Sequence, residues 1–150
     1  MQNAFTWVKG ATTMVFVKTQ MAGMDMAMPD VCLTPIPTPA GPVPTPIPYP
    51  NIAMPMTAIP SQFKVLVLAM PAHNMMTVTP MSNGDNAGVN MNPLSGMVMG
   101  PTRSMMGSTN LMMGGLPATK MLSPTGQNGM SPGAFGASLA PSQVKVMSLR

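Results

Sequence analysis

The residues that could do chemistry are few and scattered along the chain. Its 150 residues include one cysteine, one histidine and three acidic residues: Cys32, His73, Asp25, Asp30 and Asp85. Cys32 and His73 could form a nucleophilic dyad if they met in space, but the sequence offers no third group to orient such a pair. The three aspartates do not suggest an acid/base pair either. We therefore do not expect an enzyme.

Methionine offers a second chemistry, because thioether sulfur binds soft cations such as Cu(I). The chain has 22 methionines, and four lie within residues 21–28: Met21, Met24, Met26 and Met28. Others fall in predicted strands, where methionine serves as an adaptable apolar filler. Packing is the preferred interpretation, and a methionine-rich protein that binds copper or zinc is the alternative function.

Composition limits the class of partner. Only seven Lys and Arg and three acidic residues give a net charge of +4, and 45% of residues are apolar. Disordered chains have the opposite composition, and no basic cluster indicates nucleic acid. A surface so poor in charge predicts extensive coverage by protein partners.

The chain shows no sign of targeting to a membrane. The N-terminal residues 1–18 lack the apolar core of a secretory signal peptide, and the apolar run at 65–72 is too short to span a bilayer. The single cysteine allows no intramolecular disulfide. We expect synthesis in the cytoplasm and no membrane anchor.

These residues must be positioned by strands and turns. With 19 prolines and 14 glycines, almost no stretch is free of helix breakers. Short β-rich segments predict strands at 12–18, 62–69, 96–100, 109–115 and 143–149. The sequence predicts an all-β body of short strands and hairpins, with Pro/Gly-rich loops and little or no helix.

An internal repeat supports that fold. "PSQFKVLVL" at 60–68 returns as "PSQVKVMSL" at 141–149, and Pro-Ala followed by Asn-Gly occurs from 71 and again from 117. Asn-Gly favours turns with positive φ. The repeat predicts pseudo-symmetric hairpins, with Val65, Val67, Val144 and Val146 in the core.

Prolines fall at nearly every second position of residues 35–50. Because successive amides of an extended chain point to opposite edges, this spacing removes the donors from one edge of a strand. The phase slips at Ala40-Gly41, where glycine favours a turn. A polyproline II linker or ligand is the alternative, but Ile47, Tyr49 and Ile52 favour packing.

Four segments resemble the PAAR-like proteins of the Tox-PAAR-like type. "MDMAMPDVCLTPIPTPAGPVPTPIPYPNIAM" at 24–54 carries the "PIPYPN" hallmark, and further blocks lie at 71–89, 95–119 and 140–148. The family motif comprises Pro42, Val43, Pro44, Pro46, Ile47, Pro48, Tyr49, Pro50 and Asn51.

The resemblance implies a compact conical body, a structural tip that caps and sharpens the trimeric VgrG-type spike of a contractile injection system. Such systems include type VI secretion, phage-tail-like and extracellular machines, and their tips carry effectors into target cells. We expect one domain over 1–150 with no fused toxin, assembled at the spike tip, with a separately encoded toxin as a possible partner.

The resemblance also implies one zinc ion near the vertex, held in this family by three His and one Cys. Cys32 and His73 alone cannot complete such a site. Asp25, Asp30 or Asp85 would have to supply further ligands. The alternative is that Cys32 is a small buried apolar group, His73 is a turn residue and no cofactor is bound.

Overall fold

The computed structural model describes residues 14–149, so most of the N-terminal segment considered for a signal peptide lies outside the described residues. The described chain is all-β, as predicted, with one turn of 3-10 helix, η2 (Pro55–Thr57). No helix among residues 14–149 is long and apolar enough to cross a membrane. The strands are β1 (Met14–Phe16), β2 (Met24–Thr38), β3 (Gly41–Ala53), β4 (Leu66–Val67), β5 (Met70–Pro71), β6 (Val78–Thr79), β7 (Ser82–Asn83), β8 (Thr102–Ser104), β9 (Met112–Met113), β10 (Leu116–Pro117), β11 (Pro124–Gln127), β12 (Ala134–Ala140) and β13 (Met147–Leu149).

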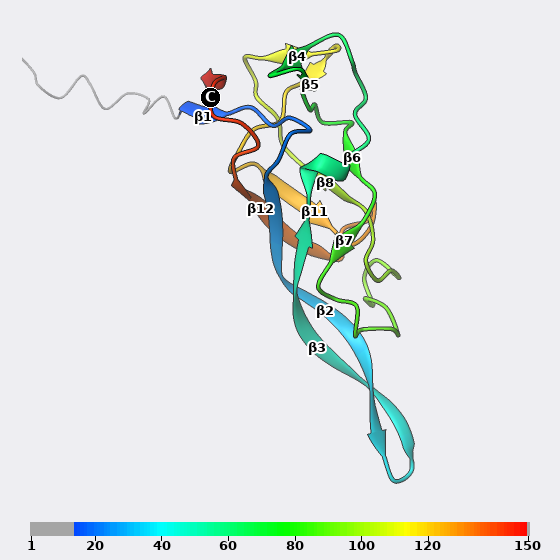
Figure 1. The fold of residues 1–150 in the computed structure, drawn as a ribbon. Coiled ribbons are helices and arrows are strands. Elements are labelled where there is room, and N and C mark those ends of the chain that lie inside the picture. The colour runs from blue at the N-terminus through cyan, green and yellow to red at the C-terminus, as the bar shows by residue number, and fades with distance from the viewer. Residues whose placement is uncertain (1–13, 150) are drawn as a thin grey trace, which may run out of the picture.

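One antiparallel sheet runs through the body in the order β6-β8-β11-β12-β2-β3-β7. Its two longest strands, β2 and β3, form a hairpin that projects well beyond the body (Figure 1). The hairpin closes at the pair Thr38–Gly41 through the two-residue turn Pro39-Ala40, and Gly41 has φ +121°. The proline segment is therefore part of the folded protein, with its turn where the proline phase slips.

The proline spacing explains how this ribbon is paired. Pro35 lies opposite Pro44, and Pro37 lies opposite Pro42. Since proline has no N–H, these pairs make no backbone hydrogen bonds across the ribbon. The residues between the prolines make the hydrogen bonds that join β2 to β3. The outer edge of β3 carries proline at 42, 44, 46, 48 and 50, and it pairs with β7 only beyond them, at Ile52 and Ala53.

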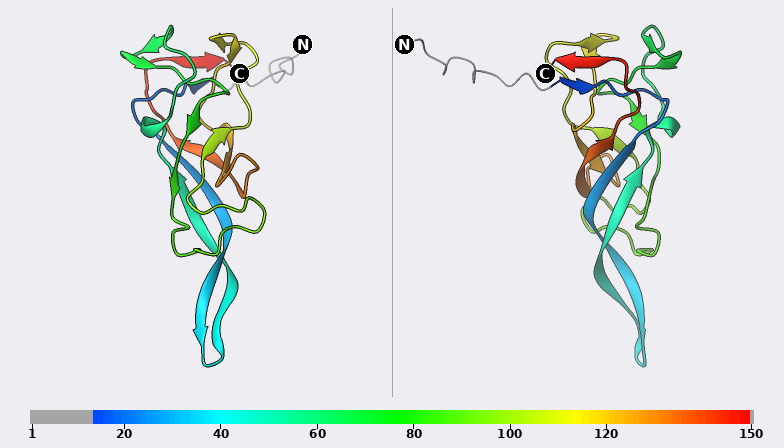
Figure 2. Two further views of the ribbon diagram at one scale, coloured as in Figure 1. Left: turned by 90° about the vertical axis from the view of Figure 1, so that its right-hand side faces the viewer. Right: turned by 60° about the vertical axis from the view of Figure 1, so that its left-hand side comes forward.

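Three small two-stranded sheets lie together at the end of the body opposite the ribbon (Figure 2). They are β1–β13, β4–β5 and β9–β10, and all are antiparallel. We call them the three arms, and the end that they form the base. The repeat predicted at 60–68 and 141–149 lies in two of these arms, and the Pro-Ala of the third is Pro117-Ala118. The predicted pseudo-symmetry is therefore present.

The hydrophobic core lies at the base. Val17, Ala72 and Ala118 are fully buried there, and Val67 and Met113 pack with them. Val65 is partly buried against this cluster, but Val144 is 66% exposed and Val146 is 38% exposed. The prediction that Val144 and Val146 lie in the core was wrong. The centre of the base is filled instead by the small residues that follow the three arms, Val17, Ala72 and Ala118.

Two local predictions also differ from the structure. Residues 96–100 form bends and no strand. The Asn-Gly turns were expected to have positive φ at both residues. Asn128 and Gly129 do, at +57° and +131°. At Asn83-Gly84 the only left-handed residue is Gly84, since Asn83 is extended in β7. The other predicted strands contain β1, β4, β9 and β13, each shorter than predicted.

Candidate functional site

The base is organised around a pseudo-threefold axis. Lys18 N–H donates to Thr119 O at 2.9 Å, Thr119 N–H to His73 O at 3.0 Å, and His73 N–H to Lys18 O at 2.9 Å. These three bonds close a ring in which each residue comes from the segment following one arm. Three distant parts of the chain therefore occupy equivalent positions.

Further backbone bonds repeat in threes around the same axis. Val17, Ala72 and Ala118, one after each arm, donate to Val146, Val65 and Leu111 at 3.1, 3.0 and 2.8 Å. Gln20, Met75 and Met121 donate to Pro71, Pro117 and Phe16 at 3.1, 3.1 and 2.8 Å. The symmetry is thus a property of the hydrogen-bonding framework and not only of the sequence repeat.

The outer faces of the arms expose equivalent apolar side chains. Leu66, Met112 and Met147 pair with Pro71, Pro117 and Phe16 in their respective arms. They are 56%, 62% and 47% exposed. Exposed apolar residues gathered at one end of a protein are typical of a binding surface.

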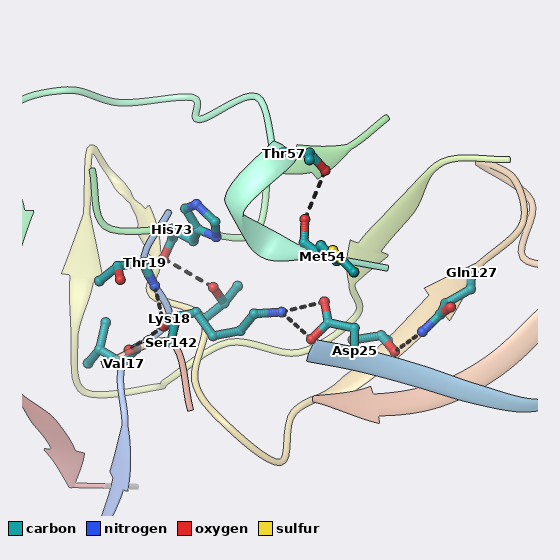
Figure 3. A network of polar contacts seen from close by, with 11 residues as sticks. Val17, Lys18, Thr19, Asp25, Met54, Thr57, His73, Gln127 and Ser142 are labelled. Atoms are coloured by element: carbon teal, nitrogen blue, oxygen red, sulfur yellow. Dashed lines mark hydrogen bonds and ion pairs between the residues drawn. The ribbon is translucent and has the colours of Figure 1, made fainter. Parts of the chain in front are cut away.

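Beneath the ring lies a buried polar cluster (Figure 3). Lys18 Nζ reaches both carboxylate oxygens of Asp25, at 2.7 and 2.6 Å. His73 lies in the same small pocket as this pair, and its buried Nε2 has no hydrogen-bond partner in the described part of the chain. Burial, and secondarily the charge of Lys18, lowers the pKa of His73 from 6.5 to about 3. His73 is therefore a neutral imidazole at physiological pH.

A second buried cluster lies where the ribbon leaves the body. Asp30 and Cys32 are alternate residues of β2, so their side chains share one face of the strand, and Asp85 follows β7. Cys32 Sγ lies 3.6 Å from Asp30 Oδ1 and 3.6 Å from Asp85 Oδ2. One potential ligand atom from each residue lies within 4.8 Å of the others, and all three side chains are fully buried. We call these residues the DCD cluster.

Three asparagine side chains surround the DCD cluster as donors. Asn51 and Asn92 donate to Asp30 at 2.7 and 2.8 Å, and Asn128 donates to Asp85 at 2.8 Å. Burial, and then the charges of Asp30 and Asp85, raises the pKa of the Cys32 thiol to about 12. The thiol is therefore protonated at neutral pH in the absence of a cation.

The family model described as "Toxin PAAR-like domain" matches residues 23–134. The chain belongs to the Tox-PAAR-like family. Searches of curated proteins and of solved structures gave no significant match. Membership makes this a PAAR-type protein of the spike-tip and toxin-related class.

The Tox-PAAR-like match includes the whole ribbon and the arms β4–β5 and β9–β10, whereas β1 and β13 lie outside it. All the family-motif residues lie on β3. Tyr49 Oη hydrogen-bonds Thr34 Oγ1 across the ribbon at 2.7 Å, and Asn51 holds Asp30. A Cβ on Gly84 would lie 1.9 Å from Pro50 O. Only glycine therefore allows the loop at residue 84 to pass this close to the motif strand.

The structure separates the two residues on which the metal and dyad hypotheses relied. Cys32 lies in the DCD cluster, whereas His73 lies at the base beside Lys18. Of the possible supplementary ligands, Asp30 and Asp85 contact Cys32, and Asp25 is paired with Lys18. Sequence reasoning missed the asparagine donors Asn92 and Asn128, whose only signal was their place in Asn-Pro and Asn-Gly turns.

Copper binding by the methionines of residues 21–28 remains a hypothesis. Met21 and Met28 are exposed, and Met24 and Met26 are half-buried. Met24 and Met26 alternate along β2 with the buried Asp25 and Ala27, which is the pattern of a strand with one face turned away from the interior.

Proposed function

We propose that this protein caps the trimeric VgrG-type spike of a contractile injection system, with its base on the spike and its ribbon pointing forward. It acts as a structural tip, without enzymatic activity, that sharpens the spike for membrane piercing. A separately encoded toxin would be carried on the same tip. The protein would be assembled at the spike in the cell that makes it and delivered outward with it.

The ring Lys18–Thr119–His73 is the observation that carries this proposal. A trimeric spike ends in three identical surfaces around a threefold axis. One chain can contact all three surfaces equally only if it presents three equivalent surfaces itself. The arms around the ring meet this condition within a single polypeptide.

The chemistry of the two ends supports the orientation. The base exposes Leu66, Met112 and Met147, which a partner would remove from water. The ribbon lies at the opposite end (Figure 2). The outer edge of β3 cannot donate to an added strand along the prolines. The ribbon, which cannot pair with an added strand along its prolines, is suited to point away from the spike. The apolar base is suited to bind the spike.

The test is co-purification with a trimeric VgrG-type spike protein from the same organism. We expect one copy of the chain per spike trimer by native mass spectrometry. Leu66→Asp, Met112→Asp and Met147→Asp should each weaken binding by roughly tenfold or more, because a desolvated carboxylate at an apolar contact costs at least 1.4 kcal/mol. By pseudo-symmetry, the three effects should be similar.

Val43→Asp is the matched control. Val43 is also an exposed apolar residue on a strand, but it lies near the end of the ribbon. The variant should bind the spike as the wild type does. Absence of any complex with the wild type, or equal weakening by Val43→Asp and the arm variants, would contradict the proposal.

A further inference from the structure

The DCD cluster carries an imbalance of charge. Asp30 and Asp85 are fully buried, yet neither has an ion-pair partner among residues 14–149. The buried Asp25, in contrast, is neutralised by Lys18. Burying carboxylates without a counter-charge is costly. A bound cation would supply that charge where no described side chain does.

Two buried oxygen atoms at the DCD cluster lack a hydrogen-bond partner among residues 14–149. They are Asp85 Oδ1 and the side-chain oxygen of Asn51, and both residues are fully buried. Asn51 already donates to Asp30, so its oxygen belongs to the same group of side chains. Unpaired buried acceptors are rare in folded proteins. Together with the charge imbalance, they indicate an electropositive ligand.

The spacing of the donors suits a tetrahedral ion. Zn–S bonds near 2.3 Å and Zn–O bonds of 2.0–2.2 Å at tetrahedral angles place sulfur and oxygen about 3.5–3.7 Å apart. Cys32 Sγ lies 3.6 Å from an oxygen of each aspartate. Asn92 and Asn128 donate hydrogen bonds to the carboxylates, as residues around the ligands of a metal site commonly do.

We propose that Asp30, Cys32 and Asp85 bind one structural Zn²⁺ ion, with the Asn51 oxygen as the candidate fourth ligand. The ion would displace the thiol proton of Cys32, which passes to solvent, and would be held by a thiolate and oxygen atoms. The site excludes His73, in contrast to the three histidines and one cysteine expected from the family. This proposal does not depend on spike binding.

The position of the site gives the ion a mechanical role. Asp30 and Cys32 belong to β2 just before the exposed half of the ribbon, Asp85 to the loop after β7, and Asn51 to the end of β3. Leu33 also exchanges backbone hydrogen bonds with Asn90 and Met91 of the neighbouring loop, at 3.1 and 3.0 Å. The ion would therefore link the part of the ribbon nearest the body to the loop after β7.

The experiment measures metal binding by the full-length protein after dialysis against a chelator. Titration with Zn²⁺ should give one equivalent and a rise in melting temperature. Co²⁺, used as a spectroscopic substitute, should give a thiolate-to-cobalt charge-transfer band. Cys32→Ala and Asp85→Asn should lower Zn²⁺ affinity by at least about 100-fold, which is the largest loss usually caused by substituting residues that only hydrogen-bond to metal ligands.

Asp85→Asn keeps the experiment informative if Cys32→Ala fails to fold. Its amide oxygen can still accept the bonds from Asn128 and Met99, while its NH₂ takes the place of the unpaired oxygen. The zinc-free variant should therefore be at least as stable as the zinc-free wild type. His73→Gln is the control and should bind Zn²⁺ normally.

Three outcomes would overturn the proposal. They are a wild type that takes up neither Zn²⁺ nor Co²⁺, binding that persists in Asp85→Asn, and a folded His73→Gln variant that loses binding. The first would leave the DCD cluster as a buried hydrogen-bond network. The last would return His73 to the ligand set.

Discussion

Gln62 and Gln143 make the same hydrogen bonds in two different arms of the base. Gln62 Nε2 donates to Val65 O and Ala72 O at 3.1 and 2.6 Å, and Gln143 Nε2 donates to Val146 O and Val17 O at 2.6 and 2.9 Å. Each Oε1 accepts an N–H bond at 2.8 Å, from Val65 or Val146. The glutamine of each "PSQ" segment thus ties the two strands of its arm together, in addition to the backbone bonds Ala72–Val65 and Val17–Val146.

Replacing either glutamine with alanine should destabilise the protein by a similar amount, about 2–4 kcal/mol. Both side chains are buried, and removing either one breaks at least three hydrogen bonds, including one to a buried carbonyl, Ala72 O or Val17 O. Urea unfolding measures the change in the free energy of unfolding. Lys64→Ala, an exposed change in the same segment, is the control and should cost less than about 0.5 kcal/mol. A marked inequality between Gln62→Ala and Gln143→Ala would contradict their equivalence.

The sequence predicts features that depend on local backbone rules. The turn of the ribbon follows from the position of Gly41 and from the slip in proline phase, both of which act within a few residues. The hairpin of "PSQFKVLVL" is likewise local. Its equivalent in the β1–β13 arm pairs the two ends of the described chain, so its existence depends on the closed fold.

The core and the DCD cluster were harder to predict, because they too depend on contacts between distant parts of the chain. Apolar character suggested Val144 and Val146, whereas the axis accommodates Val17, Ala72 and Ala118, whose small size matters only once three arms converge. Strand alternation could have placed Asp30 beside Cys32. The contribution of Asp85 depends on where a loop returns, which no local pattern specifies.

Restoring donors to the outer edge of β3 should make the protein self-associate. Pro44→Thr/Pro46→Thr introduces two outward N–H groups on an exposed and apolar ribbon. Such an edge can pair with another copy. We expect higher-order species by light scattering at concentrations where the wild type is monodisperse. Pro80→Thr, a change at an exposed loop proline, is the control. An unchanged scattering profile would mean that the prolines do not protect this edge.

His73 should make the base sensitive to acid. Its pKa falls from 6.5 to about 3 on folding, because the side chain is buried and faces Lys18, which is itself paired with Asp25. Between these pH values the unfolded chain binds a proton that the folded chain does not. Stability is therefore greatest above pH 6.5 and decreases as the pH falls towards 3, by up to about 4–5 kcal/mol from this group.

His73→Gln removes that group and retains the backbone bonds of the ring. The test is the free energy of unfolding of both proteins by urea between pH 7.5 and pH 3.5. Carboxylates that titrate in the same range contribute equally to both proteins, so their effect cancels in the difference. We expect the variant to be less stable than the wild type, or similar, at pH 7.5 and to lose less stability as the pH falls. Parallel pH profiles would show that His73 gains a proton in the folded state, and that the ring tolerates a charge beside Lys18.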